Sequence, residues 1–100
     1  MASINVAGVT FTNEDGESRQ QILRDLGFGF HYALLKQTTY ENERAVEVWI
    51  DSKMVGYVPR KNLDDAMSYA EILRAQILYM EQEDILYVEL TSLEQPMFAS

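Results

Sequence analysis

Cysteine is missing from the sequence, which excludes disulfides, thiolate metal sites and cysteine nucleophiles together and fits a reducing compartment. Histidine occurs once, at His31, whereas a zinc site needs several nitrogen or sulfur ligands and a catalytic histidine needs an orienting partner. A lone histidine in an aromatic segment is more often structural. The five glycines form no phosphate-binding loop. The sequence therefore contains no recognisable catalytic centre, and we expect a non-enzymatic protein without a cofactor.

Long hydrophobic runs and a leader are also missing. No apolar run approaches the ~20 residues that span a bilayer, and the first five residues lack the basic and apolar regions of a signal peptide. The expectation is a cytoplasmic domain with no membrane partner. Sixteen carboxylates leave an oxygen-only metal site open, but Asn13-Glu14-Asp15-Gly16 lacks the alternating ligand spacing of a calcium loop and is typical of a turn.

The sequence has enough apolar residues for a core and a strong excess of acid. With 100 residues, 47% of them apolar, it fits one domain. The net charge of −8 argues against a partner bound mainly through its phosphates. However, residues 36–61 carry five basic and four acidic side chains, while the remainder carries three basic and twelve acidic ones. Any anionic ligand is expected in this middle segment.

Hydrophobic periodicity predicts more strands than helices. Alternation favours strands over 3–12 (broken at Gly8), 28–35, 45–50, 54–58, 77–81 and 85–90. Helices are predicted over 18–26, from a Ser18 capping box to a left-handed stop at Gly27, and over 62–74, capped by Asn62 with Asp64 and Asp65 in its first turn. Residues 38–44 are predicted to form a polar loop.

These elements predict an α+β, mainly β fold: a small antiparallel OB/SH3-like barrel or curled sheet with two helices packed on it. Residues 45–50 and 54–58 form the best hairpin, in which Val46, Val48 and Ile50 share one face. Residues 28–35 place Phe28, Phe30, Tyr32 and Leu34 on one face. One domain is expected over 1–92, followed by a loose tail over 93–100.

The middle segment interleaves aromatic and basic side chains. Tyr40 and Arg44 precede the hairpin that contains Trp49, and Tyr57 and Arg60 follow at its end. Rings that stack on bases and cations that contact phosphates are what binding of a single strand requires. The alternative is a core tyrosine or two beside a solvated charged loop, and composition alone favours that alternative.

The order of motifs from Leu34 to Lys61 resembles the HIRAN domain, a small module of fork-remodelling helicases and stand-alone bacterial proteins. Tyr40-Glu41 resembles the family's Tyr-Asp pair, and Ala45-Val46-Glu47-Val48 resembles its strand. The return Val55-Gly56-Tyr57-Val58-Pro59-Arg60 is the closest match, and the helical segment from Leu63 follows it. Val6–Phe11 with Arg19-Gln20 also resembles the opening of bacterial members, so the similarity covers about residues 4–75.

The resemblance implies an OB-like barrel that binds the 3′ end of single-stranded DNA. Tyr40 would stack on the terminal base, Glu41 would accept from the 3′-hydroxyl, and Arg60 would meet phosphate beside Tyr57. A carboxylate suits a free hydroxyl and repels a continuing phosphate. The chain departs from the family pattern in having Glu for Asp, one extra residue before Ala45, Arg44 for the usual Asn, and Ile4-Asn5 for a basic–aromatic pair.

The functional prediction is therefore a HIRAN-like, non-catalytic module for single-stranded DNA ends. Its binding residues are expected to be Tyr40, Glu41, Tyr57 and Arg60, supported by Arg19, Arg44, Lys53 and Lys61. The alternative is a protein-interaction or oligomerisation module, a homodimer or the binder of another protein, that keeps the barrel and has lost DNA binding. The net charge of −8 favours this alternative, in which Trp49 could anchor an interface.

Overall fold

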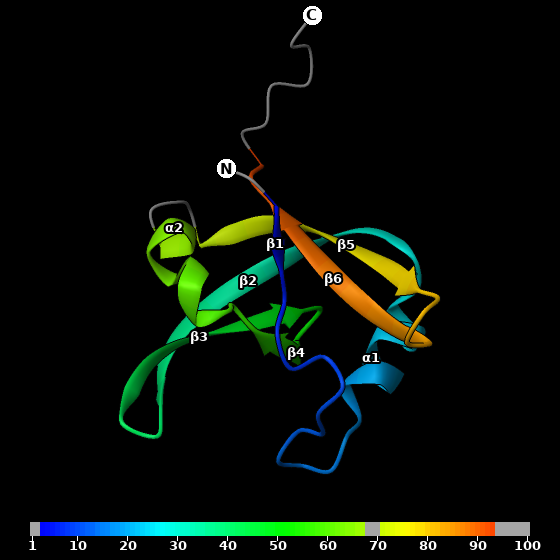
Figure 1. Ribbon diagram of the computed structural model, residues 1–100, viewed down its shortest axis with the longest axis horizontal. Coiled ribbons are helices and arrows are strands. Elements are labelled where there is room, and N and C mark those ends of the chain that lie inside the picture. Colours follow the sequence, from blue (N-terminus) through cyan, green and yellow to red (C-terminus); the bar gives the residue numbers. More distant parts are fainter. Residues whose placement is uncertain (1–2, 68–70, 94–100) are drawn as a thin grey trace, which may run out of the picture.

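The computed structural model of the protein describes residues 3–67 and 71–93, which form one curled sheet and short helices (Figure 1). In chain order the elements are β1 (Ile4–Asn5), α1 (Arg19–Leu26), β2 (Gly29–Tyr40), β3 (Glu43–Ile50), β4 (Lys53–Tyr57), the 3-10 turn η1 (Arg60–Asn62), α2 (Leu63–Met67), β5 (Ile72–Met80) and β6 (Ile85–Thr91). None of the helices in these described residues is long and apolar enough to cross a bilayer.

All neighbouring strands pair antiparallel, in the order β1-β6-β5-β2-β3-β4. The sheet curls until its two outermost parts meet. Just beyond β1, the Ala7 amide donates to the Tyr57 carbonyl at 2.7 Å, and the Tyr57 amide donates to the Ala7 carbonyl at 2.9 Å. The prediction of a mainly β, antiparallel, barrel-like domain with two short helices is confirmed.

Gly56 allows this meeting of the sheet ends. A β-bulge pairs Val48 with Gly56 and Trp49 with Met54, so Val55 and Gly56 are both buried on the β4 side. A Cβ at position 56 would lie 2.5 Å from Val6 Cγ1 and closer still to the Ala7 carbonyl oxygen. Only glycine therefore lets the Ala7 backbone approach β4 closely enough to form both hydrogen bonds.

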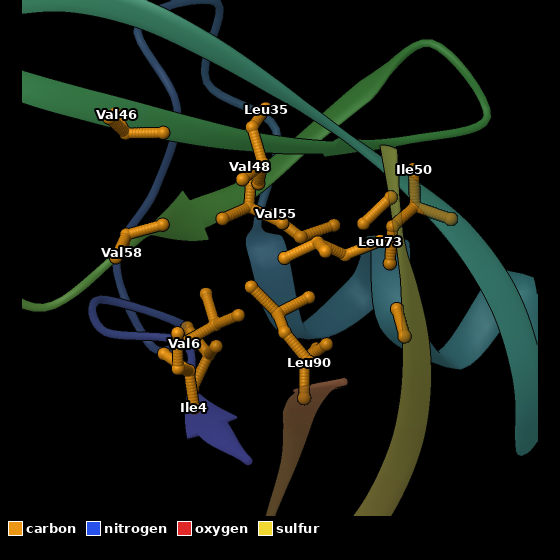
Figure 2. Packing of buried hydrophobic residues seen from close by; sticks show 14 of the residues in the cluster. Ile4, Val6, Leu35, Val46, Val48, Ile50, Val55, Val58, Leu73 and Leu90 are labelled. Carbon is orange, nitrogen blue, oxygen red and sulfur yellow. The ribbon is translucent and has the colours of Figure 1, made fainter. Parts of the chain in front are cut away.

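The inner face of the curled sheet contains the core. Val46, Val48 and Ile50 alternate inward from β3, as predicted, and are almost completely buried. Side chains from β1, β4, β5 and β6 point toward them in Figure 2. Helix α1 packs against β4 and β6 and contributes Ile22 and Leu23, both buried, to the core. A closed inner face of aliphatic side chains explains why so short a chain needs no disulfide.

Helix α1 spans the predicted segment, but both of its caps differ in detail from the prediction. The Ser18 hydroxyl accepts from the Gln21 amide at 3.2 Å, and Gly27 ends the helix with a φ of 88°. The capping box is half formed, because the Gln21 side chain bonds Asp25 instead of returning to Ser18. The ψ of 161° at Gly27 is extended, so the stop is a positive-φ glycine but not a left-handed helical one.

The predicted loop over 38–44 is wrong. Strand β2 continues to Tyr40, β3 begins at Glu43, and they pair along their whole shared length. The connection is the two-residue turn Glu41-Asn42, whose φ values of 52° and 66° give it the twist that hairpins favour. The β-branched Thr38 and Thr39 support an extended arm, and Asn tolerates positive φ without glycine. The β2–β3 arm projects from the body in Figure 1.

The predicted second helix is too long. Helix α2 is described over Leu63–Met67, whereas residues 72–74 belong to β5, because Leu73 alternates with Ala75 and Ile77 on the buried face. The helix has Asp64 and Asp65 in its first turn, as predicted. It follows directly on η1, in which the Asn62 backbone amide donates to the Pro59 carbonyl. Residues 68–70 lie outside the described residues.

Two other boundary predictions differ. Of the predicted first strand over 3–12, only Ile4–Asn5 forms a strand, because the chain turns at Gly8 with a φ of 76°. The closing β5–β6 hairpin is confirmed, with β5 beginning earlier than predicted. Most of the predicted tail, 94–100, lies outside the described residues.

We expect Gly56→Ala to lower the free energy of unfolding by more than about 2 kcal/mol, because its methyl group must push apart two backbone segments in the core. Urea unfolding followed by circular dichroism measures the change. The matched control is Gly16→Asn, since a Cβ at Gly16 meets nothing within 4 Å and Asn tolerates positive φ. Equal stability of Gly56→Ala and the parent protein would contradict this account of closure.

Candidate functional site

A groove with a volume of about 830 Å³ opens where the segment after Gly8 faces β3 and β4. Six of the eight predicted binding residues line it: Tyr40, Tyr57, Arg19, Arg44, Lys53 and Arg60. Glu41 and Lys61 lie outside its lining. The closure of the barrel creates this groove, because Ala7 and Tyr57 form both the bridge and part of the wall.

Tyr40 and Tyr57 come together although they are 17 positions apart in the sequence. Tyr40 ends β2 and Tyr57 ends β4, and the two ring centroids lie 6.0 Å apart with an interplanar angle of 53°. This tilted arrangement is a favourable one for aromatic pairs. Tyr40 is 58% exposed and Tyr57 is half-buried, so neither belongs to the core. The two predicted rings therefore share one side of the groove.

Arg19 is a buried structural centre of the groove rather than a solvated cation. Only 5% of it is exposed. Its Nε donates to Asn13 Oδ1 at 2.7 Å, its Nη1 donates to the Gly8 carbonyl at 2.9 Å, and its guanidinium carbon lies 5.5 Å from the Tyr57 ring centroid. Asn13 in turn donates to the Met54 carbonyl at 3.0 Å. Arg19 thus fixes the loop, β4 and the Tyr57 ring relative to one another.

The exposed cations of the groove are paired with carboxylates. Arg60 pairs with Glu43, Arg44 with Asp64 at 2.9 Å, and Lys53 with Glu17 at 3.0 Å. The hydrogen bond that Lys53 donates to the Glu17 carboxylate raises the pKa of Lys53 above its ordinary value. Water screens such exposed pairs, so they contribute little net stability and exchange partners readily. The groove is therefore lined by compensated charge and not by a field of one sign.

The two predicted residues outside the groove lie at its margins. Glu41 occupies the tip of the β2–β3 arm, next to Tyr40, and is exposed. Lys61 lies in η1, next to Arg60, and is also exposed. Both are thus sequence neighbours of a residue that lines the groove.

Three further residues make tertiary contacts that the sequence did not predict. Gln20 links α1 to the sheet, because its amide donates to the Val9 and Leu86 carbonyls and accepts from the Leu86 amide. Asn13, read from sequence only as a turn residue, orients Arg19. The lone histidine is structural in its contacts: His31 Nε2 donates to the Gly27 carbonyl at 3.0 Å. No sequence motif marks these tertiary contacts.

Clusters of three or more metal-binding side chains are not found among the residues that the structure describes. Comparisons with protein-family models, with curated proteins and with solved structures find no match for this chain. The resemblance to the HIRAN family therefore stays a prediction.

Proposed function

We propose that the protein is a non-catalytic module that binds the end of a single-stranded nucleic acid, most specifically a DNA 3′ end, in the groove beside Tyr40 and Tyr57. The observation that carries the proposal is the tyrosine pair, 6.0 Å between centroids, on the wall of a groove that exposed arginines also line. Rings and guanidinium groups together are the side chains that single-strand binding uses. The resemblance to the HIRAN domain points to the same residues.

Stacking is the main source of affinity in this proposal. The Tyr40 ring is 58% exposed and free to receive a base, and a stacked base contributes about 1–3 kcal/mol. The Tyr57 ring is already oriented by Arg19 and by Tyr40, so binding does not have to order it. Preorganised rings allow useful affinity despite the net charge of −8.

Phosphate contacts come from Arg44 and Arg60 by exchange of partners. Each guanidinium now bonds an exposed carboxylate, Asp64 and Glu43 respectively, and a phosphate can take the place of either. Because only two or three cations take part, the binding constant is expected to depend weakly on salt. A plot of the logarithm of the binding constant against the logarithm of the salt concentration should have a slope near −2. A shallow slope distinguishes this mode from a basic groove.

In this proposal, Glu41 distinguishes the 3′ end of a nucleic-acid strand from the interior of the strand. It follows Tyr40 at the exposed tip of the arm, where its carboxylate can accept from the sugar 3′-hydroxyl of a terminal nucleotide whose base stacks on Tyr40. A 3′-phosphate at that point meets a like charge.

We expect a short oligonucleotide with a free 3′-hydroxyl to bind more tightly than the same oligonucleotide with a 3′-phosphate. Tyr40→Ala should weaken binding by about 5- to 150-fold, the equivalent of one stacked base. Fluorescence anisotropy at low salt measures both effects. Tyr79→Ala is the control, because Tyr79 is 50% exposed but does not line the groove. Absence of binding, or equal binding of the two ends, would disprove the end-binding proposal.

A second expectation follows from the Glu43–Arg60 pair. Glu43→Gln removes a carboxylate from the groove and releases Arg60, so binding of the 3′-hydroxyl oligonucleotide should tighten by about 3- to 10-fold at low salt. Glu81→Gln makes the same change in overall charge at the β5–β6 turn, away from the groove, and should change affinity less than about twofold. If both variants tighten binding equally, net charge and not Arg60 is responsible.

A further inference from the structure

The outward face of β2 and its neighbours carries a cluster of apolar side chains. Ala33 and Leu35 are buried, and the alternate side chains Phe30, Tyr32 and Leu34 are 65%, 73% and 38% exposed. Leu34 is paired with Ile72 of β5 on one side and with Trp49 of β3 on the other. We name these five residues the outer patch: Phe30, Tyr32, Leu34, Trp49 and Ile72.

We propose that the outer patch is the surface through which two copies of this chain form a symmetric dimer. This inference does not rest on the proposed nucleic-acid binding. The exposed fractions of Phe30, Tyr32, Leu34 and Ile72, together with the half-buried Trp49, give roughly 500 Å² of apolar area per copy, since an aromatic side chain buries 150–250 Å². A standard interface buries about 800 Å² per partner, so the outer patch supplies well over half of one. The largest apolar patch on a typical monomer measures about 300–600 Å² and is often functional, so a patch of this size fits an interaction surface.

The patch has both a projection and a recess, which a second copy can match. Tyr32, Leu34, Trp49 and Ile72 surround a hollow of about 310 Å³, whereas Phe30 lies on the same face outside the hollow. A twofold axis near Tyr32 places the Phe30 ring of each copy over the hollow of the other. Reciprocal contacts of this kind are what a symmetric interface requires.

Charge also favours a second copy at this face. Among the described residues, Lys36 and Asp51 line the hollow, Arg74 lies over the Phe30 ring, and Glu47 accepts a hydrogen bond from Trp49, so the charges of these four side chains sum to zero. Two chains of net charge −8 repel each other least through a neutral surface. Since both signs are present, Arg74 of one copy can face an acidic side chain of the other across the rim.

The sheet favours face-to-face association over addition of a strand. Its outermost strands, β1 and β4, are joined through the Ala7–Tyr57 bridge, so the ordinary route of edge pairing is blocked there. Packing of two sheet faces about 10 Å apart remains available.

Sedimentation velocity over about 1 µM to 1 mM tests the proposal, because an interface of this size is expected to dissociate in the micromolar range. The expected result is a monomer of 11.5 kDa at low concentration and twice that mass at high concentration. Higher salt should strengthen the dimer by screening the repulsion of two acidic chains, whereas it weakens nucleic-acid binding. A monomer at every concentration and salt level would overturn the proposal.

Two tyrosine variants locate the interface and separate it from the groove. Tyr32→Glu should raise the dissociation constant of the dimer at least about 50-fold while leaving oligonucleotide affinity unchanged. Tyr40→Glu makes the same chemical change at the groove and should leave the dimer intact. A dimer that survives Tyr32→Glu and the uncharged variant Phe30→Ser refutes the assignment.

The sole tryptophan gives a readout in the unmodified protein. Trp49 belongs to the outer patch, so its fluorescence should shift to shorter wavelength over the same concentrations at which the mass doubles. Mass doubling without a shift places the interface elsewhere. Circular dichroism and melting of each variant show that loss of the dimer is not loss of the fold.

Discussion

The structure depends on one close backbone approach, that of Ala7 to β4 over Gly56. Without a side chain at position 56, the two hydrogen bonds between Ala7 and Tyr57 form and the six-stranded sheet curls around its aliphatic core. The same approach places the segment after Gly8 over β3 and β4, where Arg19 fixes it by bonds to Asn13 and the Gly8 carbonyl. The groove and the tyrosine pair follow from closure, since Tyr57 takes part in the bridge itself.

An acidic protein can bind an anionic strand if its rings contribute more than its charges. The exposed arginines of the groove are compensated by Glu43 and Asp64, so in the proposed binding mode a phosphate replaces one of these carboxylates. In the groove, the exposed positive charges are neutralised by salt bridges. The outer patch, in contrast, consists of apolar side chains, and the few charged side chains around it balance. The two proposed surfaces meet at Trp49, which lines both hollows, and they are expected to respond to salt in opposite directions.

Sequence predicted what local chemistry determines. The Ser18 cap defined α1, and the alternation of Val46, Val48 and Ile50 defined β3 and the curled antiparallel fold. It missed the β2–β3 arm, because the turn Glu41-Asn42 adopts positive φ without glycine. The sequence analysis also extended the second helix through Leu73, because the apolar residues around Leu73 fit the period of a helix as well as that of a strand. Only the pairing of this segment with β2 identifies it as a strand. Six of the predicted site residues line one groove. The burial of Arg19 and the exposure of Phe30 and Tyr32 arise from tertiary packing that no local pattern contains.

Hydrogen exchange of the Ala7 and Tyr57 backbone amides, measured residue by residue by NMR, tests the closure most directly. If the bridge is an integral part of the barrel, both amides exchange only through global unfolding, with the same opening free energy as central β3 amides such as that of Val48. If instead the two amides exchange at the rates of exposed loop residues while the Val48 amide stays protected, the barrel opens at this point, and the groove described here is not a stable feature of the protein.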